Sequence, residues 1–438
     1  MTSSYVIRGC RPLGAAKVDI AITDAVISAI GENLPAPAGS REINADDQIA
    51  LPGLVDLHTH LREPGREDAE TVLSGSRAAA AGGYTAVCAM ANTNPVADTA
   101  GTVEQVWRLG QEAGLVHVQP IGAVTMGLQG TALAELGAMA DSAANVRIFS
   151  DDGKCVHDAV IMRRALEYVK AFGGVIAQHA QEPRLTEDAQ MNESALSGVL
   201  GLRGWPAVAE EAIIARDVLL ADHVGSRLHV CHVSTAGSVE IIRWAKARGI
   251  DVTAEVTPHH LLLTEELVRS YNPVYKVNPP LRSERDVHAL REALADGTID
   301  IVATDHAPHP SEDKDCEWAE AAMGMVGLET AVGVVAQSMV DTGLLDWAGV
   351  ADRMSIRPAV IAGLADQGRR LAVGEPANIT LVNTQAPYLV EPARLRSASR
   401  NTPYAGHTLP VSVWTTFFNG RITLDGSADL GELTGGAR

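Results

Sequence analysis

Short apolar runs alternate with longer helical patterns between about residue 53 and residue 365. The runs are rich in Val, Ile and Ala, which is typical of buried strands. Eight runs are predicted as strands: LVDLH (54–58), YTAVCAM (84–90), VHVQPIGAV (116–124), VRIFS (146–150), GVIAQH (174–179), RLHVCHV (227–233), DVTAEVT (251–257) and TIDIVATD (298–305). Eight strands with intervening helices predict an α/β fold, a TIM-like (β/α)8 barrel.

The two ends of the chain have a different pattern. Residues 5–47 and 375–424 contain short alternating segments such as KVDIAIT, NITLVN and VSVWTTFFNG, separated by Gly, Pro and Asn. Each end is too short to form a stable sheet alone, so we expect both ends to pair into one small β-sandwich module. The predicted domains are therefore a module from 1–52 and 366–438 and a catalytic barrel over 53–365.

Composition narrows the class of protein. The 438 residues include 35 Lys and Arg against 54 Asp and Glu, a net charge of -19, and no segment forms a basic track for nucleic acid. The chain has neither a basic, apolar leader at its start nor a membrane-length apolar run, so we expect a cytoplasmic protein without a membrane partner. Five scattered cysteines without Cys-x-x-Cys spacing argue against disulfides and thiolate metal sites: Cys10, Cys88, Cys155, Cys231 and Cys316.

Polar residues recur at the carboxyl ends of the predicted strands, where barrel active sites are built. They are His58 and His60 after the first strand, Asp151 and Asp152 after the fourth, His179 after the fifth, His232 near the end of the sixth and Asp305 at the end of the eighth. A single histidine at a strand end is more often a hydrogen-bonded core residue than a ligand. Placements at five strand ends on one rim favour a shared site.

The residue types at this rim predict metal chemistry. Nitrogen and oxygen ligands without cysteine suit Zn²⁺ or a similar divalent ion, and six of them exceed the need of one tetrahedral ion. Two ions sharing a carboxylate are therefore expected. A pair about 3.5 to 4 Å apart can hold a bridging hydroxide and polarise a carbonyl oxygen, which is the chemistry of attacking or re-forming an amide.

A series of motifs then identifies a family. In chain order they are HTHLREPG, MANTNP, FSDDG, QHAQE, HVCHVST, EVTPHHL, KVNPPLR and ATDHAPH. Together they closely resemble the type I dihydroorotases of the amidohydrolase superfamily, from about residue 52 to about residue 330, with a weaker echo in NTPYAG (401–406). The resemblance implies a first metal held by His58, His60 and Asp305, a second held by His179 and His232, and Asp152 as the bridging ligand.

The same resemblance implies substrate contacts. Arg62 and Asn92 would bind an α-carboxylate together with Asn278 and His309, and backbone near Gly324 would contact the ring. Arg62 has independent physical support, because a guanidinium offers a planar fork to a carboxylate and this one lies two residues beyond a predicted ligand. Three other histidines of the motifs are expected to be structural: His259, His260 and His306.

The resemblance implies a zinc-dependent dihydroorotase that reversibly converts N-carbamoyl-L-aspartate to L-dihydroorotate in pyrimidine synthesis. A metal-bridged hydroxide would attack the ring carbonyl, with Asp305 as the catalytic proton carrier. One alternative is a hydantoinase, dihydropyrimidinase or allantoinase, whose substrates lack the carboxylate that Arg62 would bind. Another is a silent homologue that assembles with aspartate transcarbamoylase, although such a protein would be expected to lose ligands. Whether the chain forms a homo-oligomer is left open by the sequence.

Overall fold

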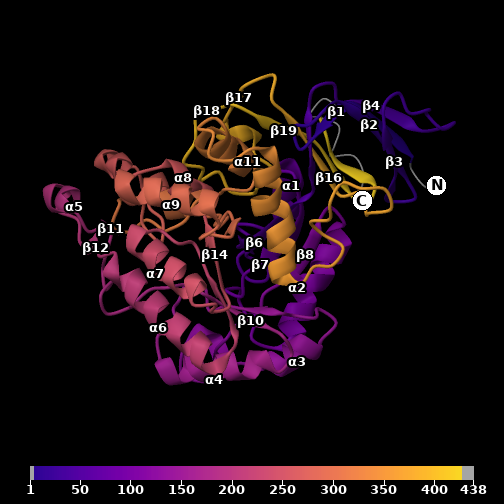
Figure 1. The fold of residues 1–438 in the computed structure, drawn as a ribbon. Coiled ribbons are helices and arrows are strands. Elements are labelled where there is room, and N and C mark those ends of the chain that lie inside the picture. Colours follow the sequence, from indigo (N-terminus) through magenta and orange to yellow (C-terminus); the bar gives the residue numbers. More distant parts are fainter. Residues whose placement is uncertain (1–3, 427–438) are drawn as a thin grey trace.

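The structure is a computed structural model and describes residues 4–426. Its centre is a barrel of eight strands, which confirms the predicted fold class (Figure 1). The barrel strands are β6 (Leu54–Thr59), β7 (Tyr84–Ala89), β8 (His117–Pro120), β9 (Ile148–Phe149), β10 (Val175–Gln178), β13 (Arg227–Val230), β14 (Val252–Val256) and β15 (Ile301–Val302). Each lies within or overlaps a predicted run, and most are shorter, because the polar residues at their ends leave the strand ladder.

All the barrel strands pair in parallel. One set runs β6-β7-β8 and the other β9-β10-β13-β14-β15. Single parallel bridges between Gly122 and Phe149 and between Thr59 and His306 join the two sets on both sides. The ring is therefore closed, so the carboxyl ends of all eight strands meet at one rim.

A helix follows each barrel strand and covers the outside of the barrel (Figure 1). These helices are α1 (Val72–Ala81), α2 (Ala100–Ala113), α3 (Leu136–Asp141), α4 (Ala159–Lys170), α6 (Val208–Val224), α7 (Ala236–Ala247), α9 (Glu284–Asp296) and α11 (Ala331–Val335). Shorter elements lie in the loops or after the barrel: β11 (Met191–Asn192), α5 (Ala195–Leu200), β12 (Gly204–Trp205), α8 (Pro258–Leu262), α10 (Ser311–Lys314), α12 (Trp347–Ala351) and α13 (Arg357–Ala362).

The two chain ends form one sheet beside the barrel. Its strands are β1 (Tyr5–Pro12), β2 (Val18–Thr23), β3 (Val26–Gly31), β4 (Arg41–Asn44), β5 (Ile49–Pro52), β16 (Ile379–Asn383), β19 (Ser412–Phe418) and β20 (Arg421–Asp425). The N-terminal β5 pairs antiparallel with the C-terminal β16, and the indigo and yellow strands lie together at the upper right of Figure 1. The pairing of both ends agrees with the expectation from their alternating pattern.

This sheet curls over its own core. Side chains from both chain ends share one buried cluster, in which the rings of Tyr5 and Phe417 meet edge to face with centroids 5.4 Å apart. A bridge between Val26 and Pro376 links β3 to the segment ahead of β16, so the two halves of the sheet face each other as a sandwich. The exact domain boundaries at residues 52 and 365 stay a prediction.

A C-terminal segment returns to the barrel between β17 (Tyr388–Leu389) and β18 (Thr408–Leu409). Glu70, which is fully buried ahead of α1, accepts hydrogen bonds from the Ser397 hydroxyl and from the Ala398 N–H at 2.9 Å. The same carboxylate lies 3.2 Å from Nε2 of His306, the residue after Asp305. Glu70 therefore fastens the C-terminal segment to the end of the eighth barrel strand.

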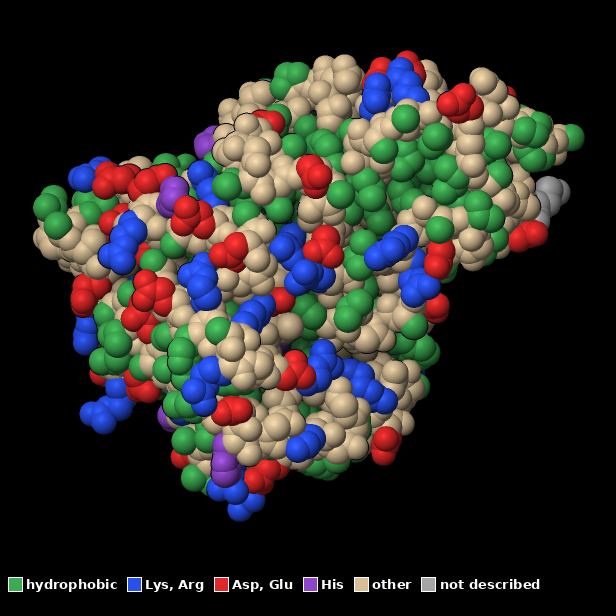
Figure 2. Space-filling model, viewed as in Figure 1, with side chains coloured by type: hydrophobic (Ala, Val, Ile, Leu, Met, Phe, Trp, Pro, Cys, Tyr) green, Lys and Arg blue, Asp and Glu red, His purple; other side chains and the backbone are tan. Residues whose placement is uncertain are grey.

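The surface carries both signs of charge. On the face shown in Figure 2, Lys and Arg are interspersed with Asp and Glu over the barrel, and hydrophobic side chains gather over the β module. Among the helices within residues 4–426, none combines the length and the apolar character needed to cross a membrane.

Glu70→Ala should destabilise the protein by about 3 kcal/mol, because it leaves the imidazole of His306 and the buried donors of the C-terminal segment without an acceptor. The exposed Glu112→Ala on α2 is the control and should change the free energy of unfolding by less than about 0.5 kcal/mol. Urea unfolding of both variants measures the difference. Equal stability of the two would contradict the fastening role of Glu70.

Candidate active site

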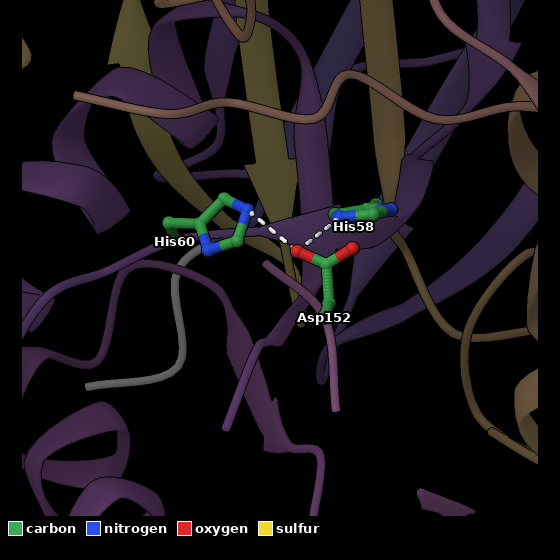
Figure 3. Close-up of side chains that lie close together, drawn as sticks. All are labelled: His58, His60 and Asp152. Carbon is green, nitrogen blue, oxygen red and sulfur yellow. Dashed lines mark ion pairs between the residues drawn. The ribbon is translucent and has the colours of Figure 1, made fainter. Parts of the chain in front are cut away.

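Asp152 lies at the centre of a buried cluster at the barrel rim. Its Oδ2 is 3.3 Å from Nε2 of both His58 and His60, the pair at the end of β6 (Figure 3). Its Oδ1 is 3.2 Å from Nδ1 of His179 and from Nε2 of His232. The two oxygens of one carboxylate thus face two separate pairs of imidazoles.

Asp305 completes the first of these pairs. Its Oδ1 lies 3.1 Å from Nε2 of His60 and 3.5 Å from Nε2 of His58. The structure therefore brings together all six side chains that the sequence predicts as ligands. All six are at most 5% exposed.

The inner ring nitrogens of this cluster are suited to a metal ion. Nε2 of His58 is buried and has no hydrogen-bond partner among the described residues. Nδ1 of His179 and Nε2 of His232 approach to 2.8 Å, a separation at which two lone pairs repel unless a proton or a cation lies with them. Ligand atoms of His58, His60 and Asp152, and of Asp152, His179 and His232, lie within 4.8 Å of one another in each group. This donor set fits divalent ions on both sides of Asp152.

The outer ring nitrogens of three histidines are each matched to an oxygen acceptor. Nδ1 of His58 lies 2.5 Å from Oε1 of Glu255, and Nδ1 of His60 lies 2.9 Å from Oδ1 of Asn92. Nε2 of His179 lies 2.8 Å from Oε1 of Gln181. An imidazole that donates its outer N–H keeps a lone pair on its inner nitrogen, which is the tautomer that binds a metal.

Glu255 is a site residue that the sequence analysis did not find. It lies on β14, accepts from His58 and His229, and receives the backbone N–H of His232 at 3.2 Å. Burial would raise the pKa of this carboxyl, but His58 and His229 outweigh it and lower the pKa to about 2. A ligand atom of Cys231 also lies within 4.8 Å of those of His58 and Glu255. Glu255 is a charged residue inside a predicted buried strand, and this feature of the sequence could have indicated a site residue.

The two acids after β9 have different roles. Asp151 accepts the backbone N–H groups of Val124 and Thr125 at 2.8 and 2.9 Å, together with the Thr125 hydroxyl, so it fixes the loop after β8. Burial would raise the pKa of Asp152, but His58 and hydrogen bonds from the surrounding histidines hold it well below its usual range. Lys154 is exposed. Asp152 is therefore the acid that faces the cluster, and its role as a bridging ligand stays a prediction.

Three site residues have left-handed backbone. The φ angles are 61° at Arg62, 30° at His232 and 47° at Asp305. Such a conformation costs about 1 to 3 kcal/mol for a residue other than glycine, so the surrounding hydrogen bonds must hold it. All three lie just beyond a barrel strand, where the chain turns away and directs the side chain to the rim.

Arg62 has a guanidinium without an acidic partner. Its Nε donates to the carbonyl of Pro308 at 3.2 Å, and no ion pair to it occurs within residues 4–426. Burial lowers the pKa of Arg62 to about 10, so the group is still charged near neutral pH. The Nδ2 donor of Asn92, the other residue expected at a carboxylate, has no partner in the described part of the chain. Both side chains can therefore donate to an anion.

His309 and Gly324, two other expected substrate contacts, already form hydrogen bonds within the protein. Burial and Arg62 lower the pKa of His309 well below its usual range, and its neutral ring donates from Nε2 to the carbonyl of Met323 at 3.0 Å. A Cβ at Gly324, where φ is 147°, would lie 2.8 Å from that Nε2. The Gly324 N–H donates to the carbonyl of Lys276, and its carbonyl accepts from Asn401. Their roles as substrate contacts stay predictions.

Two buried lysines hold the segment after His309, which the sequence analysis did not foresee. Lys314 Nζ donates to the carbonyls of Pro273, Lys276 and Ala322 at 3.0, 3.0 and 2.7 Å. Lys276 Nζ donates to the carbonyl of Trp318 at 2.7 Å. The ammonium groups thus tie the segment to the loop that carries Asn278.

The three histidines expected to be structural differ. His306 engages both ring nitrogens, with Glu70 and with the Gly327 N–H, and His260 engages both, with Thr257 and the Pro279 carbonyl. His259 has a buried Nε2 without a partner among the described residues. The structural assignment therefore accounts fully for two of the three rings.

Comparisons with known proteins agree with this geometry. The family model described as dihydro-orotase-like matches residues 47–238. A curated dihydroorotase of Streptomyces coelicolor is 72% identical over 96% of this chain and 98% of its own length, and one of Mycobacterium tuberculosis is 56% identical over 96% and 98%. Among solved structures, an L-hydantoinase from Arthrobacter aurescens superposes with a TM-score of 0.86 at 25% identity, over 98% of this chain and 97% of that one.

Fold and site together define a barrel hydrolase of the cyclic amidohydrolase class. Within that class the sequence relatives are decisive, since they align over almost the whole chain. The chain belongs to the dihydroorotase family.

Proposed function

We propose that the chain catalyses the reversible ring closure of N-carbamoyl-L-aspartate to L-dihydroorotate. The observation that carries this proposal is the charged, acid-free guanidinium of Arg62 beside the Asp152 cluster. Both substrate forms contain an α-carboxylate, which a guanidinium binds through two parallel hydrogen bonds. The simple hydantoin substrates of the hydantoinases have no such group.

We also propose that two zinc ions bind the cluster, one with His58, His60 and Asp305, the other with His179 and His232, both with Asp152. Support comes from the inner ring nitrogens of His58, His60 and His179, which can offer lone pairs to a metal when the outer nitrogens donate to the neighbouring oxygens. Such ions polarise a carbonyl oxygen and bring the pKa of water toward neutrality. The nitrogen and oxygen donor set suits zinc.

The protein's own residues orient the substrate and move the proton. Arg62 and Asn92 hold the carboxylate, which directs the scissile amide of the ring toward Asp152. In hydrolysis, water adds to the ring carbonyl carbon, and the bond from this carbon to the ring nitrogen breaks. Asp305 accepts the proton from the water and returns it to the departing nitrogen; ring closure reverses these steps. Burial would raise the pKa of Asp305, but His58 and His60 outweigh it and lower the pKa, so the group starts as an acceptor.

The alternative, a hydantoinase-type activity, is favoured by one observation, the high structural similarity to hydantoinases. Shared architecture does not set the substrate, which depends on the groups at the rim. A silent assembly partner is disfavoured, since all six predicted ligand side chains converge on one point.

Arg62→Lys tests the substrate assignment. It keeps a positive charge but loses the forked carboxylate contact. The value of kcat/KM for dihydroorotate should therefore fall by an amount that corresponds to about 1.5 to 3 kcal/mol of lost transition-state stabilisation. Zinc content should not change. Arg66→Lys, at an exposed arginine near it, is the matched control and should stay near wild type. Rates on dihydroorotate and on hydantoin decide the function: a wild-type protein that prefers hydantoin would refute the assignment.

Asp152→Ala tests the binuclear site. The zinc-loaded protein should contain close to two ions per chain, and removal of the shared carboxylate should lower the occupancy of both sites. Asp141→Ala, an exposed aspartate at the end of α3, should leave both sites filled. Elemental analysis after dialysis measures the content. A wild-type protein that never exceeds one ion per chain would argue against two sites.

Asp305→Asn separates metal binding from proton transfer. The amide keeps the size and a coordinating oxygen, but it cannot accept and return a proton near neutral pH. Activity should fall about 10²- to 10⁴-fold in both directions, even with zinc restored. Metal content, melting temperature and rates are measured on one preparation. A zinc-replete variant within tenfold of wild type would remove Asp305 from the proton path.

A further inference from the structure

Gln181 links the metal-facing cluster to the loop that carries Asn278. Its Oε1 lies 2.8 Å from Nε2 of His179 and accepts from Nδ2 of Asn278 at 3.1 Å. Its own Nε2 donates to the hydroxyl of the buried Thr186 at 2.8 Å. One amide oxygen is therefore shared by a predicted ligand and a predicted substrate contact.

The hydroxyl of Thr186 donates to the Glu182 carbonyl at 3.1 Å, so it accepts from Nε2 of Gln181 and turns Oε1 of Gln181 toward His179 and Asn278. The tautomer that His179 needs in the proposed function agrees with this orientation. In the proposed function, Nδ1 of His179 offers its lone pair to a metal, so its hydrogen must be on Nε2. That hydrogen needs an acceptor, and Oε1 of Gln181 provides it. Asn278 must then present its NH₂ group to the same oxygen, because the flipped amide would place two acceptor oxygens 3.1 Å apart.

As a result, the carbonyl oxygen of Asn278 points away from Gln181. This Oδ1 is buried and has no hydrogen-bond partner among the described residues. The next residue, Pro279, is fixed by His260, whose Nε2 lies 3.2 Å from the Pro279 carbonyl. A buried acceptor without a partner is costly, so its site should receive a donor from elsewhere.

Asn92 has the opposite polarity. Its Oδ1 is matched to the outer nitrogen of His60, which leaves its NH₂ group as the available donor. A donor suits the substrate carboxylate, whereas an acceptor such as Oδ1 of Asn278 would repel it. The two asparagines that the sequence analysis assigned to one carboxylate therefore present opposite groups.

We propose that Gln181 is a positioning residue that makes Asn278 an acceptor for an N–H of the ureido unit, the part common to dihydroorotate and carbamoyl aspartate. Arg62 and Asn92 recognise the carboxylate, and Asn278 recognises the nitrogen side of the substrate. The inference rests on the proposed function and adds a second specificity contact to it.

The test compares Gln181→Met, which removes the shared acceptor, with Gln181→Glu, which retains it. Gln181→Met should raise KM for L-dihydroorotate about three- to tenfold and weaken zinc binding about 10- to 100-fold in competition with a chelator. Gln181→Glu should keep KM within about threefold of wild type and bind zinc at least as tightly. Gln111→Met, on the exposed side of α2, is the control and should match wild type.

Asn278 variants isolate the substrate contact. Asn278→Ala should raise KM about tenfold without weakening zinc binding, and the double variant with Gln181→Met should raise KM no further, since both remove one interaction. Asn278→Ala does not depend on the folding of a Gln181 variant, so it tests the substrate contact independently. A multiplied effect in the double variant would overturn the inference. So would an unchanged KM in Asn278→Ala, or equal losses in Gln181→Glu and Gln181→Met.

The wild-type protein separates this failure from failure of the proposed function. A wild type that binds no zinc or does not turn over dihydroorotate refutes the proposed function, and the inference with it. A wild type that does both, combined with any overturning result above, refutes only the role of Gln181.

Discussion

The arrangement of the candidate site depends on one carboxylate that faces two pairs of imidazoles. Asp152 can hold this position only because β9, β10, β13 and β6 end at the same rim of a closed ring. Its two oxygens lie 3.2 to 3.3 Å from ring nitrogens of four histidines, and two of these histidines, His58 and His60, also face Asp305. Buried polar groups without a counter-charge destabilise a fold, so this cluster is suited to a cation.

Outer hydrogen bonds then determine what each inner atom can do. Glu255, Asn92 and Gln181 each place an oxygen beside the outer nitrogen of one imidazole, so that ring can donate its outer N–H and offer a lone pair from the nitrogen that faces Asp152. The same bonds set the orientation of the two amides. The tautomer of each imidazole is therefore coupled to the orientation of the amide beside it. In this way the cluster influences whether a rim side chain offers a donor or an acceptor to a substrate.

The close structural similarity to hydantoinases and the close sequence similarity to dihydroorotases are compatible. Barrel, module and metal-facing cluster supply a general means of opening or closing a cyclic amide. In the proposed function the rim loops select the ring, and here they carry the guanidinium of Arg62, which has no acidic partner among the described residues. The segment that carries His309 is further held by Lys314 and by Asn401 from the C-terminal end.

The sequence by itself determined the eight barrel strands, the pairing of the chain ends and the six residues of the cluster. Apolar runs and residues at strand ends are local signals, and a closed parallel barrel turns them into one rim. Tertiary structure alone decided the partners: Glu255 beside His58, Gln181 between His179 and Asn278, and Glu70 beneath the C-terminal segment. Apart from the contact between Gln181 and His179, these contacts join residues 97 or more positions apart. A hydrogen bond depends on ångström-scale distance and direction that no periodicity along the chain encodes.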